Sequence, residues 1–115
     1  MSLKKKILIF TATFNEVENI GKLISKIRKF HSNGHILIID DNSPDGTGDK
    51  IKLFQKKTKN LHFISRNKKL GLDSAHKLAY RFAKNNNYDY LITMDADLSH
   101  DPKEQKNFIK NLSNF

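Results

Sequence analysis

Four short apolar runs that alternate with four helical patterns constrain the fold of this chain most strongly. The runs are rich in Ile, Leu, Phe and Tyr, which is typical of strands, and they cover residues 6–11, 35–40, 61–65 and 90–94. Apolar residues recur at helical spacing in residues 15–30, 47–57 and 72–85, and again from residue 101 onward. This alternation predicts an α/β fold with a parallel, Rossmann-like sheet of about four strands and helices on both faces.

Local signals mark two of the helix starts. Asn15 with Glu18 three residues later resembles a capping box, so the first helix is predicted to begin there. Asp101 followed by Pro102 predicts a last helix, because proline fits the first helical position. Its apolar face would carry Phe108, Ile109 and Leu112.

Composition limits the class of protein. The 115 residues suffice for one domain, residues 1–115, and contain no cysteine, which excludes disulfides, thiolate metal sites and a cysteine nucleophile. No apolar run approaches the roughly 18 residues that a membrane span needs. We therefore expect a cytoplasmic protein, with peripheral contact to a membrane as an option.

The net charge of +9 favours anionic partners, although lysines on solvated helix faces would give the same value. Membrane contact through Lys4, Lys5 and Lys6 or through lysines on helix faces is one option. Nucleic acid is not expected as a partner, because acidic residues occupy the edge where a ligand would enter. The sequence also lacks interleaved aromatic and basic residues.

Polar and acidic residues follow three of the predicted strands. They lie in residues 13–16, 40–43 and 95–97. Ligands of open α/β sheets bind outside the carboxyl ends of the strands, so these residues are predicted to converge on one binding edge.

Asp95 and Asp97 stand one residue apart, and in an extended segment such residues point to the same side. Hard oxygen ligands of this kind suit Mg²⁺ or Mn²⁺, with substrate phosphates completing the coordination shell. The alternative is that both carboxylates only solvate a strand end or cap a helix. Asp101 is the better candidate for a cap.

Asp40 and Asp41 are neighbours, so in an extended strand they face opposite ways and are expected to do different jobs. A carboxylate there can accept hydrogen bonds from a nucleobase, whereas the alternative is a turn formed with Asn42 and Ser43. Asp45 and Gly46 are predicted to be structural, as a turn before a helix.

Three other features of the sequence give weaker evidence of function. Glu16 is interpreted either as stabilising a helix dipole or as contacting a ribose. The five histidines lack the spacing of metal ligands and are interpreted as structural or solvated. No glycine-rich phosphate loop is present, so phosphates would be held by a metal ion and basic side chains.

Four segments, "TATFNEVENI", "ILIIDDNSPDGTGD", "RNKKLGLDSAHKLA" and "MDADLSHDP", occur in an order and spacing that resemble a known family. The chain resembles the N-terminal, donor-binding part of family 2 glycosyltransferases, specifically the polyprenol (dolichol) phosphate mannose synthases. The resemblance covers about residues 6–112 and rests mainly on the second and fourth segments.

This resemblance implies a GT-A fold, a nucleotide-sugar donor, most often GDP-mannose, and a polyprenyl phosphate acceptor that is glycosylated with inversion. It implies a divalent cation, Mg²⁺ or Mn²⁺, held by Asp97 and Asp95, which are also the implied catalytic residues. The donor would further contact positions taken from the family pattern: Ala12, Phe14, Glu16, Ile38, Asp40, Asp41, Asp95, Ala96, Asp97 and Ser99.

The sequence departs from the family pattern at three positions. Ala12 replaces a usual proline, Phe14 a usual tyrosine and Asp73 a frequent glycine. The chain is also about half as long as family catalytic domains, so we expect a donor-binding part without the acceptor part, inactive alone and prone to self-association through an apolar sheet edge. Transfer of glucose or N-acetylhexosamine from a UDP-sugar, or nucleotide binding without catalysis, stays open.

Overall fold

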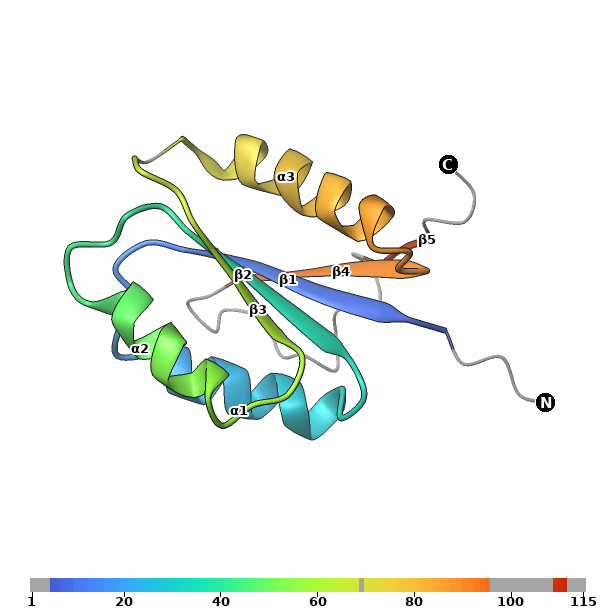
Figure 1. The fold of residues 1–115 in the computed structure, drawn as a ribbon, viewed down its shortest axis with the longest axis horizontal. Helices are drawn as coiled ribbons and strands as arrows, with labels where there is room; N and C mark the ends of the chain where they lie inside the picture. Colours follow the sequence, from blue (N-terminus) through green and yellow to red (C-terminus); the bar gives the residue numbers. More distant parts are fainter. Residues whose placement is uncertain (1–4, 69, 96–108, 112–115) are drawn as a thin grey trace.

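A computed structural model describes residues 5–68, 70–95 and 109–111 of the chain (Figure 1). The elements follow one another as β1 (Ile7–Thr13), α1 (Ile20–Phe30), β2 (His35–Asp40), α2 (Thr47–Gln55), β3 (Leu61–Ser65), α3 (Leu72–Asn85), β4 (Tyr90–Asp95) and β5 (Ile109–Asn111). The predicted bounds of β2, β3 and α3 are confirmed. Among these residues no helix is both long and apolar enough to cross a membrane.

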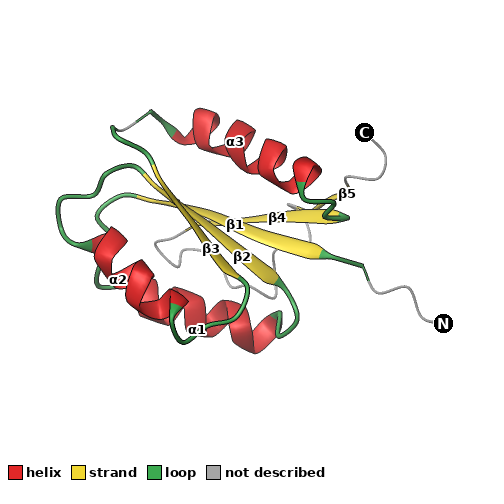
Figure 2. Cartoon of the chain, in the orientation of Figure 1, coloured by secondary structure: helices red, strands yellow, loops and turns green. Residues whose placement is uncertain are grey.

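The strands form one sheet in the order β3-β2-β1-β4-β5. The pairs β1–β2, β1–β4 and β2–β3 are parallel, which confirms the predicted four-stranded parallel sheet. Helices α1 and α2 cover one face and α3 covers the other (Figure 2). The chain order reverses beside β1, between β2 and β4, which is where ligands of open α/β sheets bind.

Alternation along the central strand divides the core between the two faces. Ile9 of β1 packs with Ile20, Leu23 and Ile27 of α1 and with Ile51 of α2. On the opposite face, Leu8 and Phe10 pack with Ala75, Ala79 and Ala83, the three buried residues of α3.

Helix α1 begins at Ile20, not at Asn15 as predicted. Asn15 has a positive φ of 56°, a left-handed conformation that asparagine tolerates better than most residues but that cannot start an α-helix. The backbone N–H groups of residues 15–17 instead donate to side chains of the loop after β2 and of Thr47, the first residue of α2. A contact distant in sequence therefore overrides the local capping signal.

The predicted last helix is wrong where the structure describes it. Ile109 lies in β5, which pairs antiparallel with β4 so that Ile109 is opposite Ile92 and Asn111 opposite Tyr90. An unpaired strand edge exposes N–H and C=O groups, and β5 covers part of the β4 edge by pairing with residues 90–92. The other predicted residues of this helix, Asp101, Pro102, Phe108 and Leu112, lie outside the described residues.

An aromatic cluster with two histidines lies at the amino end of the sheet, under α3. His35 Nδ1 is 2.7 Å and His62 Nε2 is 3.4 Å from the Tyr88 hydroxyl, and the two imidazole rings stack with centroids 5.7 Å apart. Lys6 Nζ lies 4.3 Å from the centroid of the Tyr88 ring, and Phe82 packs beside His62. These two histidines are structural, as predicted.

The environment of the cluster favours neutral imidazoles. Burial lowers the pKa of His35, and the charges of Lys6, His62 and Arg28 lower it further. Burial, then Lys6, likewise lowers the pKa of His62. The carboxylate of Asp89 also lies at this end, where it accepts a hydrogen bond of 2.8 Å from the backbone N–H of Lys6.

Stability should therefore fall as the solution is acidified. A histidine whose folded pKa is depressed contributes its stabilisation fully above the unfolded pKa of about 6.5 and loses it as the pH falls through the lower folded value. We expect the thermal midpoint to drop between pH 7.5 and pH 5. The double variant His35→Asn, His62→Gln should flatten this pH dependence, whereas His76→Gln, outside the cluster, should leave it intact. An equal slope in all three proteins would contradict the assignment.

Candidate functional site

The carboxyl ends of β1, β2 and β4 meet at one edge of the sheet. Thr13 of β1 is in register with Asp40 of β2, and Ala12 of β1 is in register with Asp95 of β4. The predicted convergence of these strand ends is therefore present in the fold. This edge lies at the reversal of strand order, so it is the candidate binding site.

Asp40 is buried, with 1% of its surface exposed, and ties the ends of β1 and β2 together. Its Oδ1 accepts hydrogen bonds from the hydroxyls of Thr13 and Ser43, each at 2.6 Å. Its Oδ2 accepts one from the Ser43 backbone N–H at 3.0 Å. Both carboxylate oxygens of Asp40 are thus occupied within the protein.

Asp41 points to a different partner, as predicted from the alternation. Arg66 donates to it twice, from Nε to Oδ1 at 2.5 Å and from Nη2 to Oδ2 at 2.8 Å. The same guanidinium donates to the Ser74 hydroxyl at 2.8 Å and the Gly71 carbonyl at 3.1 Å, while the Leu70 N–H donates to Asp41 at 3.2 Å. Asp41 therefore fixes the loop that leads into α3.

The loops after β1 and β2 are held together by side-chain acceptors. Ser43 Oγ accepts from the N–H of Asn15 at 2.8 Å, Thr47 Oγ1 from Glu16 at 3.0 Å, and Asp45 Oδ2 from Val17 at 3.2 Å. Three successive amides of one loop are satisfied by the other loop. This arrangement fixes the position of Phe14 and Glu16 relative to β2.

Asp45 and Gly46 form a turn before α2, as predicted. Asp45 Oδ1 accepts from the Thr47 N–H at 3.0 Å and also from the Thr47 hydroxyl, and Gly46 has a φ of 92° that favours glycine. Partial desolvation alone would raise the pKa of Asp45. Hydrogen bonds from the Thr47 side chain and from the backbone N–H groups of Val17 and Thr47 outweigh it, so the pKa lies below its ordinary value.

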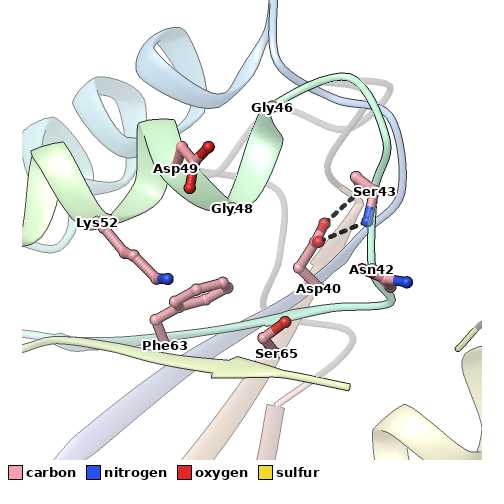
Figure 3. Close-up of a pocket in the computed structure, with 9 residues that line it drawn as sticks. All are labelled: Asp40, Asn42, Ser43, Gly46, Gly48, Asp49, Lys52, Phe63 and Ser65. Carbon is pink, nitrogen blue, oxygen red and sulfur yellow. Dashed lines mark hydrogen bonds between the residues drawn. The ribbon is translucent and has the colours of Figure 1, made fainter. Parts of the chain in front are cut away.

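A pocket of about 290 Å³ opens between the start of α2 and the end of β3 (Figure 3). Asp40 and Ser43 form one wall, and Gly46, Gly48, Asp49, Lys52, Phe63 and Ser65 complete the lining with Asn42. Its volume is at the small end of ligand sites, which span about 300–1,000 Å³. The pocket can therefore take part of a ligand that lies along this edge.

The predicted site residues fall into three groups. Ala12 and Glu16 are half-buried and Phe14 is 37% exposed, so all three have surface at the edge. The side chain of Ile38 has no exposed surface and belongs to the core under α1, because alternation along β2 turns it inward. Asp95 ends β4, while Ala96, Asp97 and Ser99 lie outside the described residues.

Several residues that build this edge were not singled out from the sequence. Thr13, Thr47 and Arg66 hold the aspartates and loops in place, yet nothing local marks a threonine or an arginine for that task. In the segment that leads into α3, Gly71 has a positive φ, at 92°. Asp73 lies in the first turn of α3. Asp73, which replaces a frequent glycine of the family, therefore does not need a positive φ.

The residues that the structure describes contain no group of three His, Cys, Asp or Glu able to hold a metal ion by themselves. Asp95 stands at the strand end beside Ala12, and it offers the hard oxygen chemistry that Mg²⁺ and Mn²⁺ prefer. A cation there would need further oxygen donors.

Comparison with known sequences decides the family. Residues 8–114 match the profile described as "Glycosyl transferase family 2". The chain belongs to glycosyl transferase family 2. The family 2 chain is 33% identical over 99 residues to the undecaprenyl-phosphate mannosyltransferase of Micrococcus luteus, covering 86% of this chain and 41% of that protein. It is 34% identical to the polyprenol monophosphomannose synthase of Mycolicibacterium smegmatis, covering 87% of this chain and 38% of that protein.

A solved structure agrees on the fold. The family 2 chain superposes on the mannosyltransferase PcManGT from Pyrobaculum calidifontis, whose structure contains GDP-Man and Mn²⁺, with a TM-score of 0.73 and 19% identity. The match covers 84% of this chain and 28% of that protein. The fold is thus of the GT-A type, as expected. The chain spans about two fifths of the length of the two mannosyltransferase relatives.

The pair of Asp41 and Arg66 should be a major stabilising feature, since their side chains are only 11% and 9% exposed. Arg66→Ala leaves a buried carboxylate without its partner, which typically costs about 3–5 kcal/mol of unfolding free energy. Urea denaturation followed by circular dichroism measures this. Lys77→Ala is the matched control, because Lys77 and Asp73 form an exposed pair at 3.6 Å that is worth about 0.3–0.5 kcal/mol. Equal losses in both variants would contradict the role of Arg66.

Proposed function

We propose that this chain binds the nucleotide-sugar donor of a glycosyltransferase that transfers a sugar, most simply mannose from GDP-mannose, to a polyprenyl phosphate. The observation that carries the proposal is the meeting of the β1, β2 and β4 ends, which brings Thr13, Asp40 and Asp95 to one edge of a family 2 fold. The relatives named as polyprenyl-type phosphate mannosyltransferases support the choice of sugar and acceptor.

The donor would lie along this edge, against Ala12, Phe14 and Glu16 on one side and the two aspartates of β2 on the other. Phe14 offers a partly exposed aromatic ring on which a base can stack. Both aspartates have hydrogen-bond donors on both carboxylate oxygens, so the proposed part of each is first to hold the edge in shape. Asp41 keeps more exposed surface, 11% of its side chain, and is the better candidate of the two for a polar contact with the nucleotide.

Asp95 and Asp97 would hold Mg²⁺ or Mn²⁺ together with the donor diphosphate, and Ala96 and Ser99 would contact the donor beside them. When bound, a divalent cation supplies positive charge that stabilises the leaving diphosphate. The acceptor phosphate is already anionic, so it needs little help from a general base to attack the anomeric carbon, and a single displacement inverts that centre.

The aligned region is about two fifths of the relatives, so we propose that it supplies donor binding and does not complete sugar transfer by itself. Self-association through a sheet edge stays a prediction, with part of the β4 edge covered by β5. The alternatives are a UDP-linked glucose or N-acetylhexosamine donor and nucleotide-diphosphate binding without transfer.

Isothermal titration calorimetry with GDP, UDP, GDP-mannose and UDP-glucose, each with and without Mn²⁺, tests the proposal. We expect guanine nucleotides to bind in the presence of Mn²⁺. Asp97→Ala should weaken this binding by about 100-fold or more, because even residues that only support a metal ligand contribute about 10–100-fold.

Asp89→Asn is the control, because Asp89 precedes β4 at the opposite, amino end of the sheet, and the amide oxygen can still accept the hydrogen bond from the Lys6 backbone N–H. It should bind the nucleotide as the unaltered chain does. Tight binding of UDP-sugars in place of GDP-mannose would favour the alternative donor. Failure of every nucleotide to bind would overturn the proposed function.

A further inference from the structure

The outer surface of α1 and α2 concentrates the positive charge of the protein. Residues 20–30 and 47–59 together contain nine Lys and Arg and a single acid, Asp49, and so account for nearly all of the net charge of +9. Both helices cover the same face of the sheet (Figure 1). The charge is therefore presented on one side of the molecule.

Three of these cations have contacts within the protein or line the pocket of the candidate site. Arg28 donates to the carbonyls of Gly34 and Lys59, and Lys50 donates to the Val17 carbonyl at 2.9 Å. Lys52 lines the pocket beside Asp40. The other six are exposed and are called the basic helix face below: Lys22, Lys26, Lys29, Lys56, Lys57 and Lys59. Both ion pairs found among the described residues, Arg66–Asp41 and Lys77–Asp73, lie on the opposite side of the sheet.

Apolar surface lies among these lysines. A wide, shallow hollow of about 620 Å³ separates α1 from α2 and is lined by Gly21, Lys22, Ser25, Lys26 and Phe54. Gly21 lets the Phe54 ring approach α1, since a Cβ atom at this position would lie 3.0 Å from Phe54 Cζ. Leu53, next to Phe54, is 58% exposed, and Phe30 at the end of α1 is 41% exposed.

We propose that the basic helix face docks on the surface of an anionic phospholipid bilayer. Lysine side chains on such a face can extend toward lipid phosphates while their methylene stems cover apolar surface, and Leu53 and Phe30 can enter the boundary between headgroups and acyl chains. Each lysine near an anionic leaflet adds an attraction that depends on salt.

The face fits a membrane better than a nucleic acid. All six of its exposed cations are lysines, whereas nucleic-acid recognition favours the planar guanidinium of arginine. The more exposed of its two apolar side chains, Leu53, has no ring on which a base could stack. Membrane docking rests on the proposed function only for its biological role, because a polyprenyl phosphate acceptor resides in a membrane. The surface itself is separate from the nucleotide edge, so the two proposals can fail independently.

The absence of tryptophan from the chain allows a clean test. Leu53→Trp places one indole on the basic helix face, and Leu72→Trp places one at a site of similar exposure, 61%, at the start of α3 on the opposite face. Each protein is titrated with two kinds of vesicle, one of phosphatidylcholine alone and one that also contains about 30% phosphatidylglycerol. The second kind has a negative surface potential. We expect the emission of Leu53→Trp to shift to the blue only with the anionic vesicles, and that of Leu72→Trp to stay unchanged.

A charge variant completes the test. Replacing Lys22, Lys26, Lys56 and Lys57 by glutamine in the Leu53→Trp protein should weaken vesicle binding by roughly 100-fold or more, at about fivefold per lysine. Nucleotide binding should not change, because none of these residues lies at the β1, β2 and β4 ends. No shift in Leu53→Trp, an equal shift in Leu72→Trp, unaltered binding by the charge variant, or binding of a single-stranded oligonucleotide in place of vesicles would each overturn the proposal.

Discussion

The paired aspartates at the end of β2 are the interaction on which the candidate site depends. Asp40 accepts hydrogen bonds from β1 and from the following turn, and Asp41 forms a two-bond pair with Arg66. Because the two side chains leave the strand in opposite directions, one strand end fixes the loops on both faces of the sheet. A carboxylate without these donors would be costly to bury, so the loops and the aspartates stabilise each other.

The fold was largely predictable because strand and helix periods are local properties of the sequence. The bounds of β2, β3 and α3 follow from their apolar patterns and flanking polar residues. The start of α1 was not predictable from local sequence, because side chains some 30 residues away accept hydrogen bonds from the amides of Asn15, Glu16 and Val17. Likewise, Ile109 pairs with β4 and does not continue a helix, since edge pairing is a tertiary effect.

The site was predictable in outline and not in detail. Strand ends could be placed at one edge from the alternation alone, and Asp40 and Asp41 could be given separate tasks. The partners Thr13 and Arg66 could not be assigned, because only the register of β1, β2 and β3 brings them together. The local turn between Asp40 and Ser43 was predicted as an alternative and is present. Ile38 was placed at the ligand by the family pattern, yet its position in β2 turns it into the core.

We propose separate roles for the two surfaces. The carboxyl edge would bind the nucleotide, and the basic helix face, with its lysines and apolar side chains away from that edge, would contact the membrane. Two-dimensional NMR of the isotope-labelled chain with GDP-mannose and Mg²⁺ locates the donor on the fold. Donor binding at the carboxyl edge should shift the amide signals of Thr13, Glu16, Asp41 and Asp95 and leave those of His35, His62 and Tyr88, at the opposite end, unchanged. Shifts confined to that opposite end, or no shifts at all, would contradict it.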